Sequence, residues 1–183
     1  QKPDMKVLMI EKGRSIEKRQ CPKRTTKVCV GCKPCSITTG FAGAGAFSDG
    51  KLSLSPDVGG TLPEILGYEK AEELIKEADN IYLKFGADEK VYGIDDYEAI
   101  ERIRAKAIRA NLKLIECPIR HLGTEEGYKI YTRLQEHLLA SGVEIKFMTM
   151  VQDIIIEDGV AKGVVTDKEE TYYADEIVSG IGR

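Results

Sequence analysis

The chain has 183 residues, which is enough for one ordinary domain with a sizeable core, or for most of one. Its 27 basic and 30 acidic residues leave a formal net charge of −3, and this balance argues against nucleic acid as the main partner. No apolar run reaches the roughly 18 residues that a membrane span requires, so we expect no membrane partner.

The first element is an apolar run at residues 6–10, of the kind that a fully buried parallel strand shows. Glu11 follows it directly. In a dinucleotide-binding βαβ unit, the second strand ends in an acid that accepts hydrogen bonds from the ribose hydroxyls, roughly 20 residues after a glycine-rich turn. Only four residues precede Met5, so we expect this chain to be the interior of a longer protein. Alternatively, the run is an ordinary buried strand with a solvated acid after it.

A basic loop rich in cysteine covers residues 14–34. Its cysteines and the next one are candidate metal ligands: Cys21, Cys29, Cys32 and Cys35. Three thiols at two-residue gaps can converge on an iron–sulfur cluster, whereas zinc usually takes two separated pairs. Redox thiols are another reading, because Lys33 would lower the pKa of a neighbouring thiol, and inert reduced thiols are a third. An odd total of five cysteines is more typical of a cytoplasmic protein than of a disulfide framework.

A glycine- and alanine-rich run follows at residues 40–50. Its glycines leave little side-chain bulk, so that a backbone can approach a planar ring or a phosphate closely. The run is not the dinucleotide fingerprint, because no buried strand precedes it and no helix clearly follows. It is also compatible with a tight packing crossing between two segments.

The middle of the chain predicts two amphipathic helices, from apolar residues that recur every three or four positions. The first covers residues 68–85. The second runs from a cap at Asp95 or Asp96 to about Ala110. Its expected buried stripe is Ile100, Ile103, Ala107 and Ile108. Residues 113–115 and the region to Leu122 predict a short strand and a turn around Cys117-Pro118.

His121 follows Arg120 in a segment flanked by proline and glycine. This pair is a candidate for general acid–base chemistry or for binding a substrate anion. His137, by contrast, is predicted to lie on the surface of a helix.

The last third of the chain has the clearest pattern. A helix of roughly 15 residues begins at Thr124, with Tyr128, Tyr131, Leu134, Leu138 and Leu139 as its apolar face, and it ends at Ser141-Gly142. A strand is expected at 143–147, followed by three short β runs at 151–157, 160–166 and 170–174. Asp158-Gly159 between two of these runs is a strong hairpin signal. A final apolar strand is expected at 176–179.

This order of elements, with Glu11 at its head, resembles the FAD-binding domain of the glutathione-reductase-like flavoproteins. The stretch 43–52 resembles the signature of an uncharacterised group of FAD-dependent dehydrogenases. The resemblance implies an α/β fold: a partial doubly wound, Rossmann-like FAD-binding domain with a β-meander and a mostly helical insertion. Residues 1–52 and 124–183 would form the FAD-binding domain, and residues 53–123 the insertion on the substrate side.

The resemblance also implies a set of cofactor-binding residues. Glu11 would bind the adenosine ribose, Lys12, Gly13 and Arg14 would form the turn after it, and the backbone of Val151 would meet the adenine. Gly180 and Gly182 would lie near the ribityl and pyrophosphate end. Backbone amides at Gly43 and Gly45, with Ser48 and Lys51, would donate to the flavin ring.

The implied function is that of an FAD-dependent oxidoreductase, which transfers hydride or electrons through the flavin N5 atom. Lys51 near the N1–O2 edge would stabilise reduced flavin, although it is also compatible with a solvated loop lysine. Its partner would be a small-molecule substrate or an electron carrier such as NAD(P). Lys51 and His121 are the candidate catalytic residues. The alternative functions are a non-enzymatic metal-binding or interaction module organised by the cysteines and, more weakly, an NAD-linked enzyme without flavin.

Overall fold

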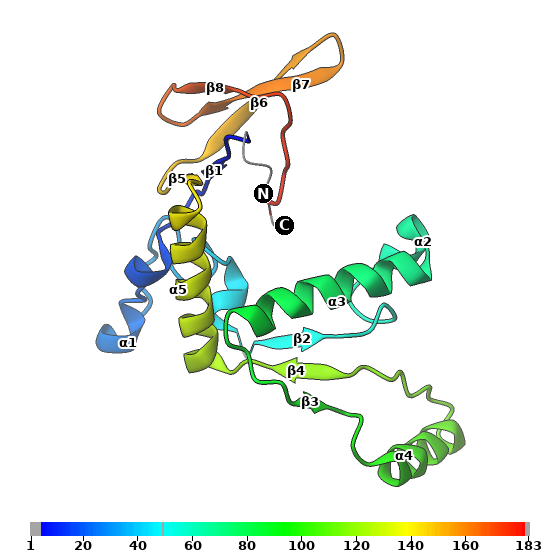
Figure 1. The fold of residues 1–183 in the computed structure, drawn as a ribbon. Helices are drawn as coiled ribbons and strands as arrows, with labels where there is room; N and C mark the ends of the chain where they lie inside the picture. The colour runs from blue at the N-terminus through cyan, green and yellow to red at the C-terminus, as the bar shows by residue number, and fades with distance from the viewer. Residues whose placement is uncertain (1–4, 49, 182–183) are drawn as a thin grey trace. The chain divides into compact units, whose positions relative to one another are not determined.

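The computed structural model describes residues 5–48 and 50–181. Contacts divide the chain into two compact units: unit 1 comprises Gln1–Phe47 and Tyr131–Arg183, and unit 2 comprises Ser48–Ile130. The fold is mixed α/β, and the strands of the described residues form three small sheets (Figure 1). Within the part of the chain that is described, no helix is both long enough and apolar enough to cross a membrane.

Unit 1 contains the parallel strand pair that the sequence predicts. β1 (Leu8–Ile10) pairs in parallel with β5 (Glu144–Lys146), so that Ile10 lies opposite Lys146. The predicted full burial of the first strand is wrong, because Met9 is 38% exposed. The strand is exposed because its sheet is small. Among the described residues this sheet has only two strands, β1 and β5, and so small a sheet does not bury both faces of β1.

The β-meander of unit 1 is also as predicted. β6 (Val151–Glu157), β7 (Val160–Thr166) and β8 (Thr171–Tyr173) form one antiparallel sheet, drawn from orange to red in Figure 1. Asp158 and Gly159 both have positive φ, 51° and 77°, which is the requirement of a tight two-residue hairpin turn. The Asp-Gly signal is therefore confirmed.

The expected final strand at 176–179 is wrong. This segment has no strand conformation, and Val178 is 94% exposed. Apolar content alone does not make a strand, because the backbone also needs a ladder partner, and none of the described strands pairs with this segment.

The helix α5 (Thr124–Ala140) confirms the helix that the sequence predicts from Thr124, and the boundary between the two units falls within it. Its predicted apolar face is partly wrong. Tyr128 is 40% and Leu139 is 48% exposed, whereas Tyr131 is buried as expected. Gln135, which lies on the same side of the helix as Tyr131, is buried too. Shorter helical segments complete unit 1: η1 (Ile16–Lys18), α1 (Lys23–Thr26) and η2 (Ala44–Phe47).

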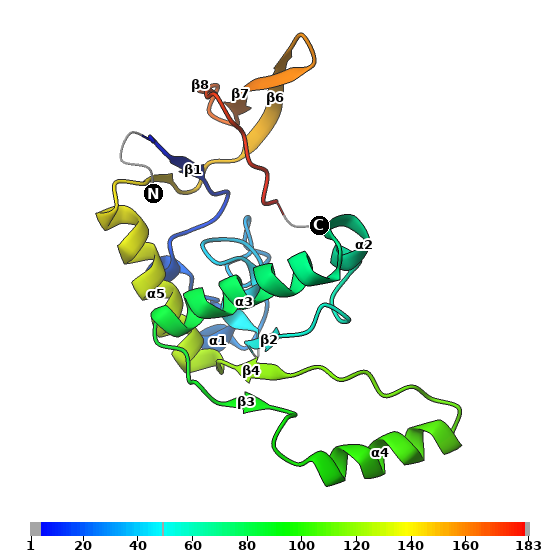
Figure 2. The same cartoon turned by 45° about the vertical axis from the view of Figure 1, so that its right-hand side comes forward.

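Unit 2 combines helices with an antiparallel sheet. α2 (Leu62–Leu66), α3 (Tyr68–Lys84) and α4 (Tyr97–Arg109) are its helices. β2 (Lys51–Ser53), β4 (Ile119–His121) and β3 (Val91–Tyr92) form the sheet, which sequence reasoning does not predict. In both views α3 lies along β2 (Figures 1 and 2). Both predicted helices are confirmed, and so is the cap, since the Asp96 carboxylate accepts the N–H of Ala99 at 2.8 Å.

One expectation for unit 2 is wrong. The stripe of α4 is not buried, because Ile103 is 54% and Ile108 is 65% exposed; the periodicity specifies a helix but not a partner for it. The short strand expected between residue 113 and Leu122 is confirmed as Ile119–His121. Pro118 has no N–H to donate, so it only accepts a hydrogen bond from Leu54, and the ladder begins after it.

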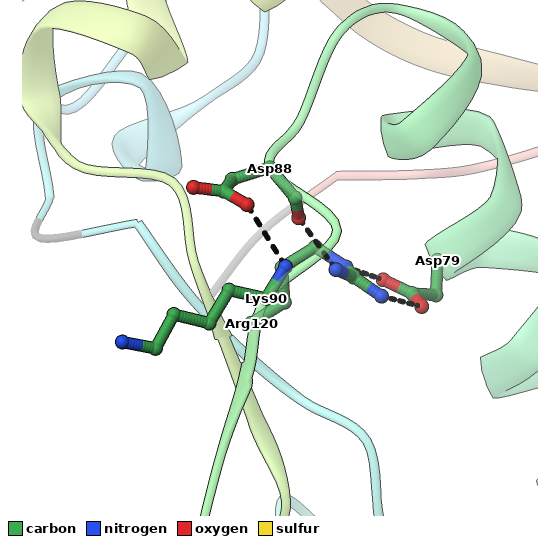
Figure 3. A network of polar contacts seen from close by, with 4 residues as sticks. All are labelled: Asp79, Asp88, Lys90 and Arg120. Atoms are coloured by element: carbon green, nitrogen blue, oxygen red, sulfur yellow. Dashed lines mark hydrogen bonds and ion pairs between the residues drawn. The ribbon is translucent and has the colours of Figure 1, made fainter.

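A buried ion pair connects α3 to β4. The Arg120 guanidinium donates to both carboxylate oxygens of Asp79, at 2.6 and 2.7 Å, and to the carbonyl of Asp88 at 2.5 Å (Figure 3). The side chains of Arg120 and Asp79 are 5% and 12% exposed. The bidentate contact with Asp79 raises the pKa of Arg120. The Arg120 guanidinium therefore has hydrogen-bond acceptors for its buried N–H groups.

Asp79→Ala should lower the free energy of unfolding by about 3–5 kcal/mol, because it leaves the buried Arg120 charge without its carboxylate. The matched control is Glu73→Ala on the same helix, which removes an exposed pair with Lys70 and should cost less than about 1 kcal/mol. Urea unfolding followed by circular dichroism measures both. Equal losses in the two variants would show that the buried pair contributes no more than the surface pair.

Candidate functional site

The carboxyl ends of β1 and β5 meet at one edge of their sheet, and this is where ligands bind in open parallel sheets. We call Glu11–Arg14 and Phe147–Thr149 together the carboxyl edge. Two backbone hydrogen bonds join its two segments: Thr149 N–H to the Glu11 carbonyl at 3.1 Å and Met148 N–H to the Gly13 carbonyl at 2.8 Å. The N–H of Glu11 also donates to the carbonyl of Lys146, at the end of β5, at 2.9 Å. The position of Glu11 is therefore determined by the sheet.

The Glu11 carboxylate closes the turn that follows β1. Its Oε1 atom accepts the N–H of Gly13 at 2.7 Å, and the side chain is half-buried. Only glycine fits at position 13, since an added Cβ would lie 2.4 Å from the backbone nitrogen of Gly40. The resemblance predicts this turn, and the close approach to Gly40 gives the physical reason for its glycine.

The start of the glycine-rich run packs directly on the carboxyl edge. Arg14 and Gly40 form an isolated parallel bridge, and Phe41 donates its N–H to the Arg14 carbonyl at 2.9 Å. The ring of Phe41 meets that of Phe147 edge-on, with centroids 6.5 Å apart. Two patterns that are separate in the sequence, the acid after the first strand and the glycine run, are thus brought together in unit 1.

Arg19 holds the glycine run in place, and sequence reasoning misses it. Its side chain is buried and donates to the carbonyls of Ser36 at 3.0 Å and Ile37 at 2.7 Å. It also donates to the carbonyls of Phe41 at 2.5 Å and Gly43 at 2.7 Å. Burial lowers the pKa of Arg19, while the charge of Glu11 acts in the opposite direction. An irregular, buried segment has backbone carbonyls that require hydrogen-bond donors from elsewhere in the chain. Such a segment in the sequence therefore indicates that a donor exists, but it does not identify Arg19 as that donor.

The remaining predicted flavin-loop residues fall in both units. Gly43 and Gly45 are exposed in unit 1, and Gly45 lies in η2. Ser48 and Lys51 belong to unit 2, where the Ser48 hydroxyl accepts the N–H of Gly50 at 3.2 Å. The roles of Ser48 and Lys51 beside a flavin therefore stay predictions.

The other implied cofactor residues lie at the surface of unit 1 or outside the described part. Lys12 and Arg14 are exposed, and Val151 begins β6 with 38% of its surface exposed. Gly180 is exposed in the segment after β8. Gly182 lies outside the described residues.

The two candidate catalytic residues are neighbours in the sheet of unit 2. Lys51 on β2 lies directly opposite His121 on β4, and both side chains are exposed. The His121 ring meets the ring of Tyr92 edge-on at 6.4 Å. The expected pairing of His121 with Arg120 as an anion site is wrong, because successive residues of a strand face opposite sides and Arg120 is buried against Asp79.

A shallow pocket of about 220 Å³ lies between β2 and α3 in unit 2, and Leu52, Ile75, Asp79 and Tyr82 are among its lining residues. Its volume is below the ~300–1,000 Å³ that is usual for small-molecule sites. The ion pair with Arg120 also engages the carboxylate of Asp79. The pocket is therefore a weaker candidate than the carboxyl edge.

The predicted metal ligands lie in the basic loop of unit 1. Cys29, Cys32 and Cys35 are exposed, and Cys21 is half-buried. Across residues 5–48 and 50–181, no three side chains of the His, Cys, Asp and Glu types are grouped so that they could hold a metal ion. The iron–sulfur or zinc set Cys21, Cys29, Cys32 and Cys35 stays a prediction.

Comparison of the chain with protein-family models and with curated proteins gives no match in either case.

Gly13→Ala should lower the free energy of unfolding by about 1–3 kcal/mol, because the new Cβ forces the backbone of Gly40 away from the carboxyl edge. Gly45→Ala is the matched control: its Cβ would meet nothing closer than the Tyr131 hydroxyl at 3.7 Å, and the change should stay within about 0.5 kcal/mol. Urea unfolding of both variants tests this. A loss for Gly13→Ala as small as that for Gly45→Ala would mean that the contact between Gly13 and Gly40 yields without cost.

Proposed function

We propose that the protein is an FAD-dependent oxidoreductase in which the carboxyl edge of unit 1 binds the adenosine end of the cofactor. The observation that carries this proposal is the position of Glu11. It stands at the carboxyl end of a parallel strand, with its carboxylate oriented by the turn of Gly13. An acid in that place is the group that binds ribose hydroxyls in dinucleotide-binding α/β folds.

The chemistry of Glu11 fits a ribose. The bond from Gly13 engages one carboxylate oxygen, and a carboxylate offers about four lone-pair sites. The two hydroxyls of a ribose are adjacent donors, so an oriented carboxylate can accept from both. Because Glu11 is half-buried, these hydrogen bonds would be less exposed to competing water than those of a surface acid.

The exposed part of the glycine-rich run supports the same proposal. A Cβ added at Gly43 would meet no atom within 4 Å, and one added at Gly45 would meet nothing nearer than 3.7 Å. There is accordingly open space beside this backbone, which a flat ring or a phosphate can approach. Arg19 anchors the carbonyls of Phe41 and Gly43, so the segment keeps its shape without regular secondary structure.

FAD bound there would supply hydride or electron transfer, and the chain would supply position and charge. Lys51 and His121 lie opposite each other on the β2–β4 ladder of unit 2, and their roles as the flavin cation and the proton donor or acceptor stay predictions. The substrate is a small molecule or an electron carrier such as NAD(P).

Glu11→Gln should weaken FAD binding by about 10- to 100-fold, because hydrogen bonds to a charged acceptor contribute about 1.5–3 kcal/mol. Glutamine keeps an oxygen for the N–H of Gly13, so the turn is preserved. Glu157→Gln, at an exposed acid at the end of β6, is the matched control and should bind FAD like the wild type. Titration followed by flavin fluorescence gives the dissociation constants.

FMN provides a second control, because it lacks the adenosine that Glu11 is proposed to bind. Glu11→Gln should leave its affinity unchanged. The proposal would be contradicted by a wild-type chain that binds no FAD, or by a Glu11→Gln variant that binds FAD as tightly as the wild type.

A further inference from the structure

The basic loop of unit 1 carries exposed thiols that the proposed FAD site does not use. Cys29, Cys32 and Cys35 are all exposed. The charged residues between Cys21 and Cys35 are all basic: Lys23, Arg24, Lys27 and Lys33. The loop is therefore a cluster of accessible thiols in a positively charged setting, and such a setting favours the thiolate form.

Cys35 occupies a special position in this cluster. Thr39 donates its N–H to the Cys35 carbonyl at 2.9 Å, which closes a turn over residues 35–39. The Cys35 sulfur is exposed at the start of this turn.

The buried side chain of Arg19 holds the turn that begins at Cys35. Arg19 donates to the carbonyls of Ser36 and Ile37, at 3.0 and 2.7 Å, directly after the cysteine. The backbone that follows Cys35 is thereby held in place before any reaction, while the sulfur itself stays open to solvent. An accessible thiol on a fixed turn in a positively charged loop is the arrangement that a nucleophilic cysteine requires.

We propose that Cys32 and Cys35 form a redox-active dithiol that exchanges with a small, negatively charged disulfide. The two cysteines are separated by Lys33 and Pro34, which is the two-residue spacing of disulfide oxidoreductase motifs. Cys35 is the attacking thiol and Cys32 the resolving one. The basic residues of the loop select a disulfide that carries carboxylates.

The exchange balances without a further reagent. The Cys35 thiolate attacks one sulfur of the small disulfide, its S–S bond breaks, and one thiolate leaves and takes a proton from water. Cys32 then gives its proton to water and attacks the Cys35 sulfur of the mixed disulfide, which releases the second small thiolate. That thiolate takes up the proton that Cys35 lost to water when it ionised. Two protein thiols are oxidised to one disulfide, and the small disulfide is reduced to two thiols.

Oxidised glutathione, which carries carboxylates, is the probe, added to the reduced chain in EDTA without FAD. This makes the outcome independent of the proposed flavin function. Mass spectrometry of the wild type should show loss of two hydrogen atoms and a Cys32–Cys35 cross-link. Cys32→Ser should instead accumulate a glutathione adduct on Cys35. Cys35→Ser should lose reaction rate by about tenfold or more, because an ordinary thiol is only a few per cent ionised at pH 7.

Three further measurements sharpen the test. Cys117→Ser, which removes a thiol of unit 2, should react like the wild type. The alkylation rate of Cys35 should reach half its maximum at a lower pH than that of N-acetylcysteine. Cystamine, a disulfide of opposite charge, should react more slowly than oxidised glutathione at low salt.

Several results would overturn the proposal. One is equal glutathione labelling of Cys29, Cys32 and Cys35, which would leave Cys35 with no special reactivity. Another is trapping of the adduct by Cys29→Ser rather than by Cys32→Ser, which would remove Cys32 as the resolving thiol. Equal rates with cystamine and oxidised glutathione would refute the selection of a negatively charged substrate.

Discussion

The rest of unit 1 depends on the hydrogen bonds that the Arg19 guanidinium donates. It reaches four backbone carbonyls, and these come from both ends of one irregular segment, at Ser36 and Ile37 and again at Phe41 and Gly43. A segment without a strand ladder cannot satisfy its own carbonyls, and a buried cation cannot remain without acceptors. Each thus removes the cost of burying the other. The planar fork of arginine suits this task, whereas a lysine ammonium would present a single point of charge.

Phe41 connects the segment held by Arg19 to the proposed cofactor site. Its carbonyl binds Arg19, its N–H binds the Arg14 carbonyl, and its ring meets Phe147. The turn after β1 and the segment after β5 are thereby fixed to the same anchor. Because a Cβ at Gly13 would collide with Gly40, the two backbones touch at this point with no side chain between them. The proposed FAD edge and the proposed dithiol are therefore both joined to one segment that Arg19 anchors.

Local signals in the sequence predict the elements that depend on local physics. The turn at Asp158-Gly159 needs two left-handed residues, and the cap at Asp96 needs one carboxylate three residues before the N–H that it accepts. Both are properties of short sequences. The strand expected at 176–179 and the burial of Ile103 depend on partners far along the chain, and apolar content cannot identify those partners. The expectations fail where a tertiary contact, not a propensity, decides the outcome.

The residues of the candidate site also differ in whether local sequence or a long-range contact determines their position. Glu11 and Gly13 can be predicted from the sequence because the strand, the acid and the turn are consecutive. The alignment of Lys51 with His121 depends on the register of a sheet that the sequence does not predict. Gln135 is an instructive intermediate case. It follows Tyr131 by one helical turn, so a polar side chain interrupts the buried face of α5. A buried amide needs both an acceptor and a donor. It finds them 118 and 119 residues away: its oxygen accepts the N–H of Ile16 at 2.9 Å, and its nitrogen donates to Glu17 at 3.0 Å. A polar residue on the apolar side of a helix thus signals a long-range contact, even where the sequence cannot name the partner.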